Sequence, residues 1–136
     1  TWGQEVDIWA VGCILIELWM GDPLFRTRHN HDHLLMMQRV LGPFPTHWLS
    51  RDQQRRFELD RDLYSHLQSL EKLIVIDDEP LTREFFRLVR ATLEYDPTRR
   101  ISAAQALEHA FFRQHVDHEQ YFRRVLQQQH EARDRV

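Results

Sequence analysis

The sequence has 136 residues, of which 42% are hydrophobic and 29% charged, a balance typical of one folded domain rather than a disordered chain. The net charge of −3 argues against the strongly basic proteins that bind nucleic acid or anionic membranes non-specifically. The one cysteine, Cys13, cannot form an internal disulfide, which favours a reducing, intracellular compartment. No positively charged apolar leader opens the chain, and the abrupt start at Thr1 suggests a piece of something longer.

The first predicted element is a helix from Ile8 to Met20, where every residue except Gly12 and Glu17 is apolar. Because it is apolar on all its faces, we expect it to be surrounded by protein. It is too short to span a bilayer, which needs about 20 residues. Gly21 is expected to end it, and Asp7, directly before the apolar run, is placed where a carboxylate can cap the first turn.

A second helix is predicted to begin at Asn30, a good N-cap residue, and to stop at Gly42-Pro43. Its apolar residues are Leu34, Leu35, Met37, Val40 and Leu41. Residues 43–80 have weak periodicity, several charges and three prolines, which predicts an irregular insert with one or two short helices. The only β-like run is Leu73 to Ile76, and because it is short we expect a mainly α fold.

Helical spacing returns after Pro80, and Asp96-Pro97 is expected to close this third helix. Its apolar positions are Phe85, Leu88, Val89 and Leu93. Ser102 and Gln105 have the spacing of a capping box for the next helix. Residues 116–136 predict a helical extension with a frayed polar tail; its proposed caps and apolar residues are Asp117, Gln120, Tyr121, Phe122, Val125 and Leu126.

Among catalytic and ligand-binding motifs, the sequence contains no glycine-rich phosphate loop and no catalytic Cys–His arrangement. His29, His31 and His33 alternate, and in an extended segment they could bind zinc or nickel. In a helix that begins at Asn30, residues two apart point away from each other, so we favour a solvated surface and no metal site. The basic residues Arg51, Arg55 and Arg56 could meet an anion, but Glu58 and Asp60 offset them and favour a solvated face.

Three longer segments carry a family resemblance. The stretch DIWAVGCILIELWMGDPLF resembles the D-x-W-x-x-G segment of eukaryotic protein kinases, and LEYDPTRRISAAQALEHAFF resembles the segment that closes their helical lobe, with Ala110 in place of a proline. Between them, HLLMMQRVLGPFP is similar to the signature of LAMMER-type (CDC-like) kinases, with Leu35 for Ala and Gln38 for Glu. The matching signature residues are His33, Leu34, Met36, Met37, Arg39, Leu41, Gly42 and Pro43.

The resemblance implies the latter, helical part of a kinase C-terminal lobe. Residues 1–115 would form this partial kinase domain, with the insert at about 43–80, and 116–136 the extension. In the family the glycine-rich loop, the phosphate-binding lysine, H-R-D, D-F-G and A-P-E all precede the D-x-W-x-x-G helix. We therefore expect no catalytic, nucleotide-binding or metal-binding residue in this chain, which would begin just after A-P-E and be inactive alone.

By resemblance, four residues support kinase segments that lie upstream of this chain. Asp7 would accept hydrogen bonds from the backbone of the catalytic loop, and Trp9 would pack beneath the activation segment. Gly12 would let another backbone come close, and Arg100 would pair with the glutamate of A-P-E. With that glutamate outside these residues, replacing Arg100 by methionine is expected to be neutral or slightly stabilising here. Taken singly, the four would be an N-cap, a core residue, a mild helix weakener and a surface charge.

The implied parent enzyme transfers the γ-phosphate of ATP, with Mg²⁺, to Ser/Thr and also to its own Tyr. Arginine/serine-rich splicing proteins are the implied substrates, the nucleus the implied location, and neither nucleic acid nor a membrane is an implied partner. Two alternatives stay open. One is a degenerate kinase-like module used only for binding, which loss of H-R-D and D-F-G upstream would indicate. The other is an unrelated helical adaptor, which leaves the long segment matches to chance.

Overall fold

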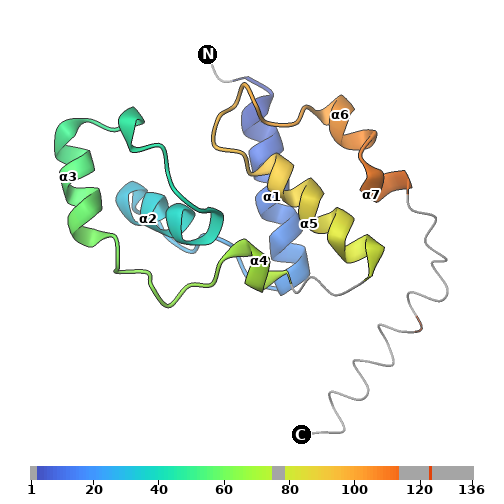
Figure 1. Ribbon diagram of the computed structural model, residues 1–136, viewed down its shortest axis with the longest axis horizontal. Coiled ribbons are helices and arrows are strands. Elements are labelled where there is room, and N and C mark those ends of the chain that lie inside the picture. The colour runs from blue at the N-terminus through green and yellow to red at the C-terminus, as the bar shows by residue number, and fades with distance from the viewer. Residues whose placement is uncertain (1–2, 75–78, 114–122, 124–136) are drawn as a thin grey trace, which may run out of the picture.

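The computed structural model describes residues 3–74, 79–113 and Arg123, and over these residues the fold is mainly α, with helices and no strand. The α-helices, labelled in Figure 1, are α1 (Glu5–Met20), α2 (Asn30–Leu41), α3 (Arg51–Asp60), α4 (Leu70–Leu73), α5 (Pro80–Thr92), α6 (Ala103–Leu107) and α7 (Ala110–Arg113). A 3₁₀ helix, η1 (Thr46–Trp48), lies between α2 and α3. None of them is both long and apolar enough to cross a membrane. Apart from Arg123, the extension predicted for residues 116–136 lies outside the described residues.

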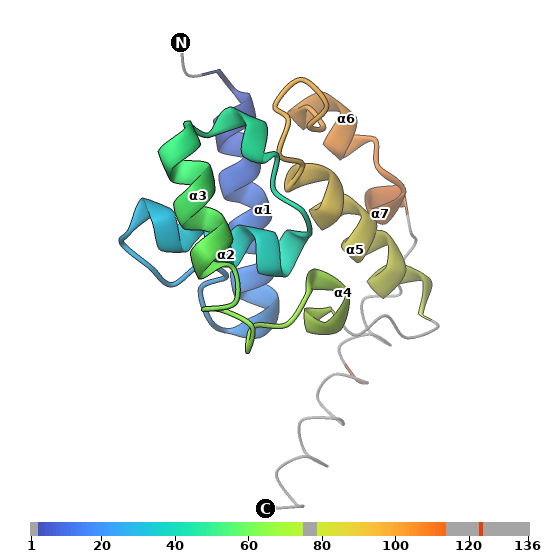
Figure 2. The same ribbon diagram turned by 60° about the vertical axis from the view of Figure 1, so that its left-hand side comes forward.

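The core forms where α1 and α5 pack side by side, as Figures 1 and 2 both show. Helix α5 presents one apolar face, because Phe85, Leu88 and Val89 recur at helical spacing and are buried. Ile16 of α1 faces it and is fully buried. The predicted third helix is therefore confirmed, with Pro80 at the first position, where a missing N–H costs nothing.

The expectation that the first helix is surrounded by protein is wrong for the described part of the chain. Only Gly12 and Ile16 of α1 are buried. Val11, Ile14 and Leu18 are 44%, 53% and 76% exposed. The core packs against one face of α1, and an apolar stripe on the opposite face has no cover among the residues that the structure describes.

The helix ends agree with the sequence better than the helix starts. Gly21 follows α1 with φ of 79°, and its N–H donates to the Glu17 carbonyl at 2.8 Å; Gly42 follows α2 with φ of 100°, and such positive angles suit glycine. Asp7 is not an N-cap, since α1 begins at Glu5 and Asp7 lies in its first turn. Asn30 is the first residue of α2 rather than its cap, which is His29.

The segment after α2 contains η1, α3 and α4. Helix α3 begins with a reciprocal Ser50–Gln53 capping box, which was not among the predicted helix starts. It packs against α2, where its Asp60 meets His31, and its Phe57 is buried. A second capping box, Ser102–Gln105 before α6, is confirmed. The β-like run predicted from Leu73 to Ile76 is wrong at Leu73, because this residue ends the helix α4. Residues 75–78 lie outside the described ranges.

Candidate functional site

The candidate site is built around Arg100, in the turn between α5 and α6. Its Nε donates to the Glu94 carbonyl at 2.9 Å and its Nη2 to the Tyr95 carbonyl at 3.1 Å. Its Nη1 donates to the carbonyl of Glu5, at the start of α1. The guanidinium carbon lies 5.2 Å from the centre of the Trp9 ring, a cation–π distance. One side chain thus joins the beginning of α1 to the turn after α5.

The ring of Trp9 contacts both this guanidinium and the ring of Tyr95. The Trp9 and Tyr95 rings are stacked, with centroids 6.2 Å apart and planes at 27°. We call Trp9, Tyr95 and Arg100 the Trp9–Arg100 cluster. Burial lowers the pKa of Arg100, while Glu5, Glu94 and Asp96 act to raise it. The guanidinium nevertheless stays charged, because its ordinary pKa is so high.

The turn that carries Arg100 is held by its own polar residues. The backbone N–H and the hydroxyl of Thr98 both donate to the Asp96 carboxylate, at 2.9 and 2.7 Å. These two hydrogen bonds are the largest cause of the lowered pKa of Asp96. The backbone N–H groups of Arg99 and Arg100 then donate to the Asp96 carbonyl at 3.0 Å. The D-P-x-x-R sequence therefore forms a closed turn that projects Arg100 towards α1.

Gly12 lies where α1 crosses the end of α5. A β-carbon at this position would lie 2.4 Å from Thr92 Oγ1 and 2.8 Å from Leu93 Cδ2. Both neighbours are buried, and the Thr92 hydroxyl is held by a 2.7 Å hydrogen bond to the Val89 carbonyl. In the described residues the close neighbours of Gly12 are thus the side chains of Thr92 and Leu93 rather than another backbone, and the approach of an upstream backbone stays a prediction.

These contacts correct one expectation from the sequence. The partners of Trp9, Gly12 and Arg100 were all expected upstream of the chain, but each residue has partners within it. Arg100 can still bind a further acceptor, because the contacts found in the described residues use three of the five N–H groups of its guanidinium.

Asp7 differs from the other three residues. It is exposed in the first turn of α1, where a negative charge interacts favourably with the helix dipole. No described residue forms a hydrogen bond or ion pair with its carboxylate. The helical period places Asp7 on the same face as Val11, Ile14 and Leu18, so a free carboxylate stands at the N-terminal end of the uncovered apolar stripe.

The residues of the signature segment (33–45) mainly pack in the fold, and no contact between them and Asp7 is found in the described residues. Met36 and Leu41 are buried, Leu34 and Met37 are half-buried, and Pro43 is exposed. The exposed Arg39 donates to the Ser65 and Leu67 carbonyls at 2.8 and 3.0 Å and so holds the loop before α4. His33 packs on Phe25, with ring centroids 5.0 Å apart, and burial lowers the pKa of its imidazole. The end of the segment reaches the Trp9–Arg100 cluster: the Gly42 carbonyl accepts a 2.9 Å hydrogen bond from the Tyr95 hydroxyl, and the Phe44 ring meets the Tyr95 ring edge to face.

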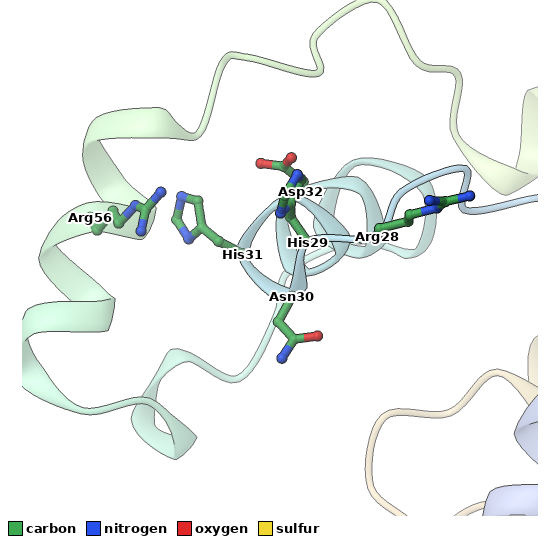
Figure 3. A pocket seen from close by; sticks show the side chains of 6 residues that line it. All are labelled: Arg28, His29, Asn30, His31, Asp32 and Arg56. Atoms are coloured by element: carbon green, nitrogen blue, oxygen red, sulfur yellow. The ribbon is translucent and has the colours of Figure 1, made fainter.

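The histidines near the start of α2 diverge. His31 Nε2 lies 2.8 Å from Asp60 Oδ2 of α3, whereas His33 packs on Phe25 and His29 is exposed. Figure 3 shows the His31 ring facing Arg56, with Asn30 and Asp32 pointing to opposite sides of α2. In the part of the chain that the structure describes, no three His, Cys, Asp or Glu side chains are grouped so that they could hold a metal ion.

The pocket beside this helix end is polar and of mixed charge. Its lining residues are Arg28, His29, Asn30, His31, Asp32 and Arg56. Arg56 lies 3.7 Å from Asp60, which also meets His31. Arg51 and Arg55 are exposed on α3 outside this pocket. Of the offset predicted from the sequence, the structure shows the pair of Arg56 with Asp60, whereas Glu58 lies 3.7 Å from Arg61.

Comparison with known proteins gives a consistent result. Residues 1–112 match the family described as "Protein kinase domain". The human "Dual specificity protein kinase CLK4" is 39% identical over 123 residues, which cover 82% of this chain and 25% of that protein. "Dual specificity protein kinase lkh1" from Schizosaccharomyces pombe is 37% identical over 131 residues, or 85% of this chain and 19% of that one. "Serine/threonine-protein kinase AFC2" from Arabidopsis thaliana is 39% identical over 127 residues, with shares of 82% and 30%.

A solved structure agrees with these sequences. The MAP kinase LMAMPK10 from Leishmania major superposes with a TM-score of 0.59 at 25% identity. The match covers 85% of this chain and 37% of that one. The chain thus spans about a quarter of the length of the curated relatives cited.

Proposed function

The chain belongs to the protein kinase family, with CLK-type dual-specificity kinases among its relatives, and on that premise we propose that it is the supporting part of a kinase's helical lobe. The complete enzyme transfers the γ-phosphate of ATP, with Mg²⁺, to Ser/Thr and also to Tyr. Arginine/serine-rich splicing proteins in the nucleus are its proposed substrates. The catalytic, nucleotide-binding and metal-binding groups belong to kinase segments outside these 136 residues.

The observation that carries this proposal is the uncovered face of α1. Asp7, Val11, Ile14 and Leu18 lie along one side of a helix whose other side packs on the core. A contiguous apolar stripe that is exposed to water is unfavourable and is typical of a surface that another segment covers. A free carboxylate at the end of the stripe can accept backbone N–H groups of that segment. We propose that the catalytic loop of the complete kinase is the segment that lies there.

The Trp9–Arg100 cluster supports a second segment in the same proposal. Two N–H groups of Arg100 remain for a carboxylate, and we propose that the glutamate of an upstream A-P-E motif binds them. The ring of Trp9, held by Tyr95 on one side, then packs beneath the activation segment. These residues position the catalytic groups without touching substrate.

The proposal predicts that the 136-residue chain alone neither binds ATP–Mg²⁺ at micromolar concentrations nor transfers phosphate, because its sequence contains no glycine-rich phosphate loop and the proposal assigns the H-R-D and D-F-G segments, which carry the catalytic Asp and the Mg²⁺ ligands, to other parts of the kinase. Isothermal calorimetry and a radiolabelled transfer assay on an arginine/serine-rich peptide are the measurements. The complete product of the same gene is the positive control and is expected to do both. Transfer by the short chain would contradict the supporting role. A complete protein that binds partners but never transfers phosphate would identify a kinase-like binding module instead.

The role of Asp7 can be tested in that complete protein. Asp7→Asn replaces a charge-assisted acceptor by a neutral one of about half the strength, a loss of about 1.4 kcal/mol, so kcat should fall about tenfold. Glu17→Gln is the matched control, because Glu17 is an exposed carboxylate of the same helix outside the stripe. An equal fall in kcat for the two variants would show that Asp7 has no special place in the site.

A further inference from the structure

Tyr95 connects parts of the molecule that are far apart in the sequence. Its hydroxyl donates to the Gly42 carbonyl at the end of α2, at 2.9 Å. Its ring stacks on Trp9 of α1, and its own carbonyl accepts from Arg100 Nη2 at 3.1 Å. The same ring meets Phe44 edge to face, with centroids 5.2 Å apart. One side chain is therefore bonded to α2, stacked on α1 and joined through its backbone to the turn of Arg100.

The attachment of Tyr95 to α2 continues outward through aromatic contacts. Phe44 lies 6.1 Å from Phe57 of α3 and 6.0 Å from the half-exposed Trp48 of η1, between ring centroids. Beside it, Arg90 of α5 donates to the Leu41 carbonyl at 2.8 Å. The end of α2 is thus fixed to the core by two polar contacts, and of these two only the Tyr95 contact leads on to Trp9 and Arg100.

The Tyr95 hydroxyl is the part of the side chain that is fixed to the end of α2, through its hydrogen bond to Gly42. Burial raises the pKa of this phenol, so the group remains a neutral donor at physiological pH. A phenylalanine ring would fill the same space but would lose its anchor on Gly42. The ring would then rotate or shift against Trp9, and the Arg100 guanidinium, whose carbon lies 5.2 Å from the centre of the Trp9 ring, would be placed less firmly.

We propose that Tyr95 is a positioning residue, which uses its hydrogen bond to Gly42 to set the placement of Trp9 and Arg100 from the end of α2. The kinase segments that Trp9 and Arg100 would support, the activation segment and the A-P-E glutamate, belong to the proposed function, and this part of the inference rests on it. The coupling itself is a property of this chain and can be tested without any kinase activity.

The experiment follows the Nε–H group of Arg100 in the 136-residue chain by NMR, with Arg100→Lys used to assign the signal. Tyr95→Phe should make its exchange with water roughly fivefold faster, the factor that corresponds to the net free energy of one hydrogen bond. Tyr95→Leu, which also removes the ring stacked on Trp9, should accelerate exchange further and shift the signal. The free energy of unfolding of each variant, measured alongside, separates local opening from global unfolding.

Phe57→Leu is the control, because it removes a buried ring of α3 that reaches Tyr95 only through Phe44. It should lower global stability and leave the Arg100 exchange by local opening unchanged. Unchanged exchange in both Tyr95 variants would overturn the proposal, as would equal acceleration by Phe57→Leu. A complete protein without phosphate transfer would overturn the proposed function and leave the NMR result standing, so the two failures are distinguishable.

Discussion

Replacing Arg100 by methionine should lower the free energy of unfolding of this chain by about 2–4 kcal/mol. Methionine keeps the length and apolar contact of the side chain over Trp9, but it removes the donors to the carbonyls of Glu5, Glu94 and Tyr95. Hydrogen bonds from a charged donor are stronger than neutral ones, and two of these three are partly buried. The carbonyls of Glu94 and Tyr95 are then left without a donor that the structure shows, whereas the Glu5 carbonyl still accepts the Trp9 N–H within α1.

This expectation reverses the one drawn from the sequence. There, Arg100→Met was expected to be neutral or slightly stabilising, because the only partner considered was a glutamate outside the chain. The three carbonyl acceptors lie within the chain, so the guanidinium is neither fully solvated nor unpaired. A carboxylate added by a complete kinase would raise the cost, by about 3–5 kcal/mol if the pair is buried.

Urea unfolding measures the effect, provided that the chain gives a cooperative transition. Arg99→Met is the matched control, since Arg99 is the exposed neighbour and its nearest carboxylate oxygen, on Glu94, is 4.0 Å away. The free energy of unfolding of Arg99→Met should stay within about 0.5 kcal/mol of the unsubstituted chain, as for most surface substitutions. Equal, small losses for the two variants would mean that the carbonyl contacts of Arg100 contribute nothing.

Gly12→Val should destabilise the chain by about 3 kcal/mol. The first added carbon alone would meet Thr92 Oγ1 at 2.4 Å and Leu93 Cδ2 at 2.8 Å, and valine adds two methyl groups to it. Thr92 cannot turn away without giving up its hydrogen bond to Val89. The two helices must therefore separate, which would loosen the contact of Ile16 with the core.

Ala10→Val is the control for this second prediction. Ala10 is exposed on the same helix, so valine there costs only its lower helix propensity, about 0.5 kcal/mol. The measurement is the urea midpoint together with the slope of the transition. A Gly12→Val variant no less stable than Ala10→Val would show that α1 and α5 do not approach closely at Gly12.

Local signals account for the parts of the fold that could be predicted. Gly21 and Gly42 mark helix ends because each takes a positive φ, and Ser102 with Gln105 marks a start because both capping bonds span three residues. The Ser50–Gln53 box has the same spacing and could have been found in the same way. The exposure of α1 could not, since an apolar run encodes what the helix prefers around it and not which segments supply the cover.

The site shows the same limit. The motif resemblance selected Trp9, Gly12 and Arg100, but their contacts join residues that the sequence does not relate. Arg100 and Glu5 are 95 residues apart, and Tyr95 and Gly42 are 53 apart. No residue pattern indicates which carbonyl a guanidinium or a phenol will meet. Tyr95 lies in the segment LEYDPTRR, but nothing in that segment predicts its hydrogen bond to Gly42, because this bond depends on the folded position of α2.

The contact between Arg100 and Glu5 also bears on how the protein is made. A ribosome adds about 5–20 residues per second, so the 95 residues that separate the two take roughly 5–20 seconds to synthesise. Until α5 has been made, the face of α1 that packs on it has no partner, and until Arg100 has been made the first turn of α1 lacks the side chain that holds it. Ile16, which is buried in the folded protein, is exposed during that time. A slower codon stretch between α2 and α5 would lengthen this exposure and should lower the yield of folded protein in cells without altering the sequence.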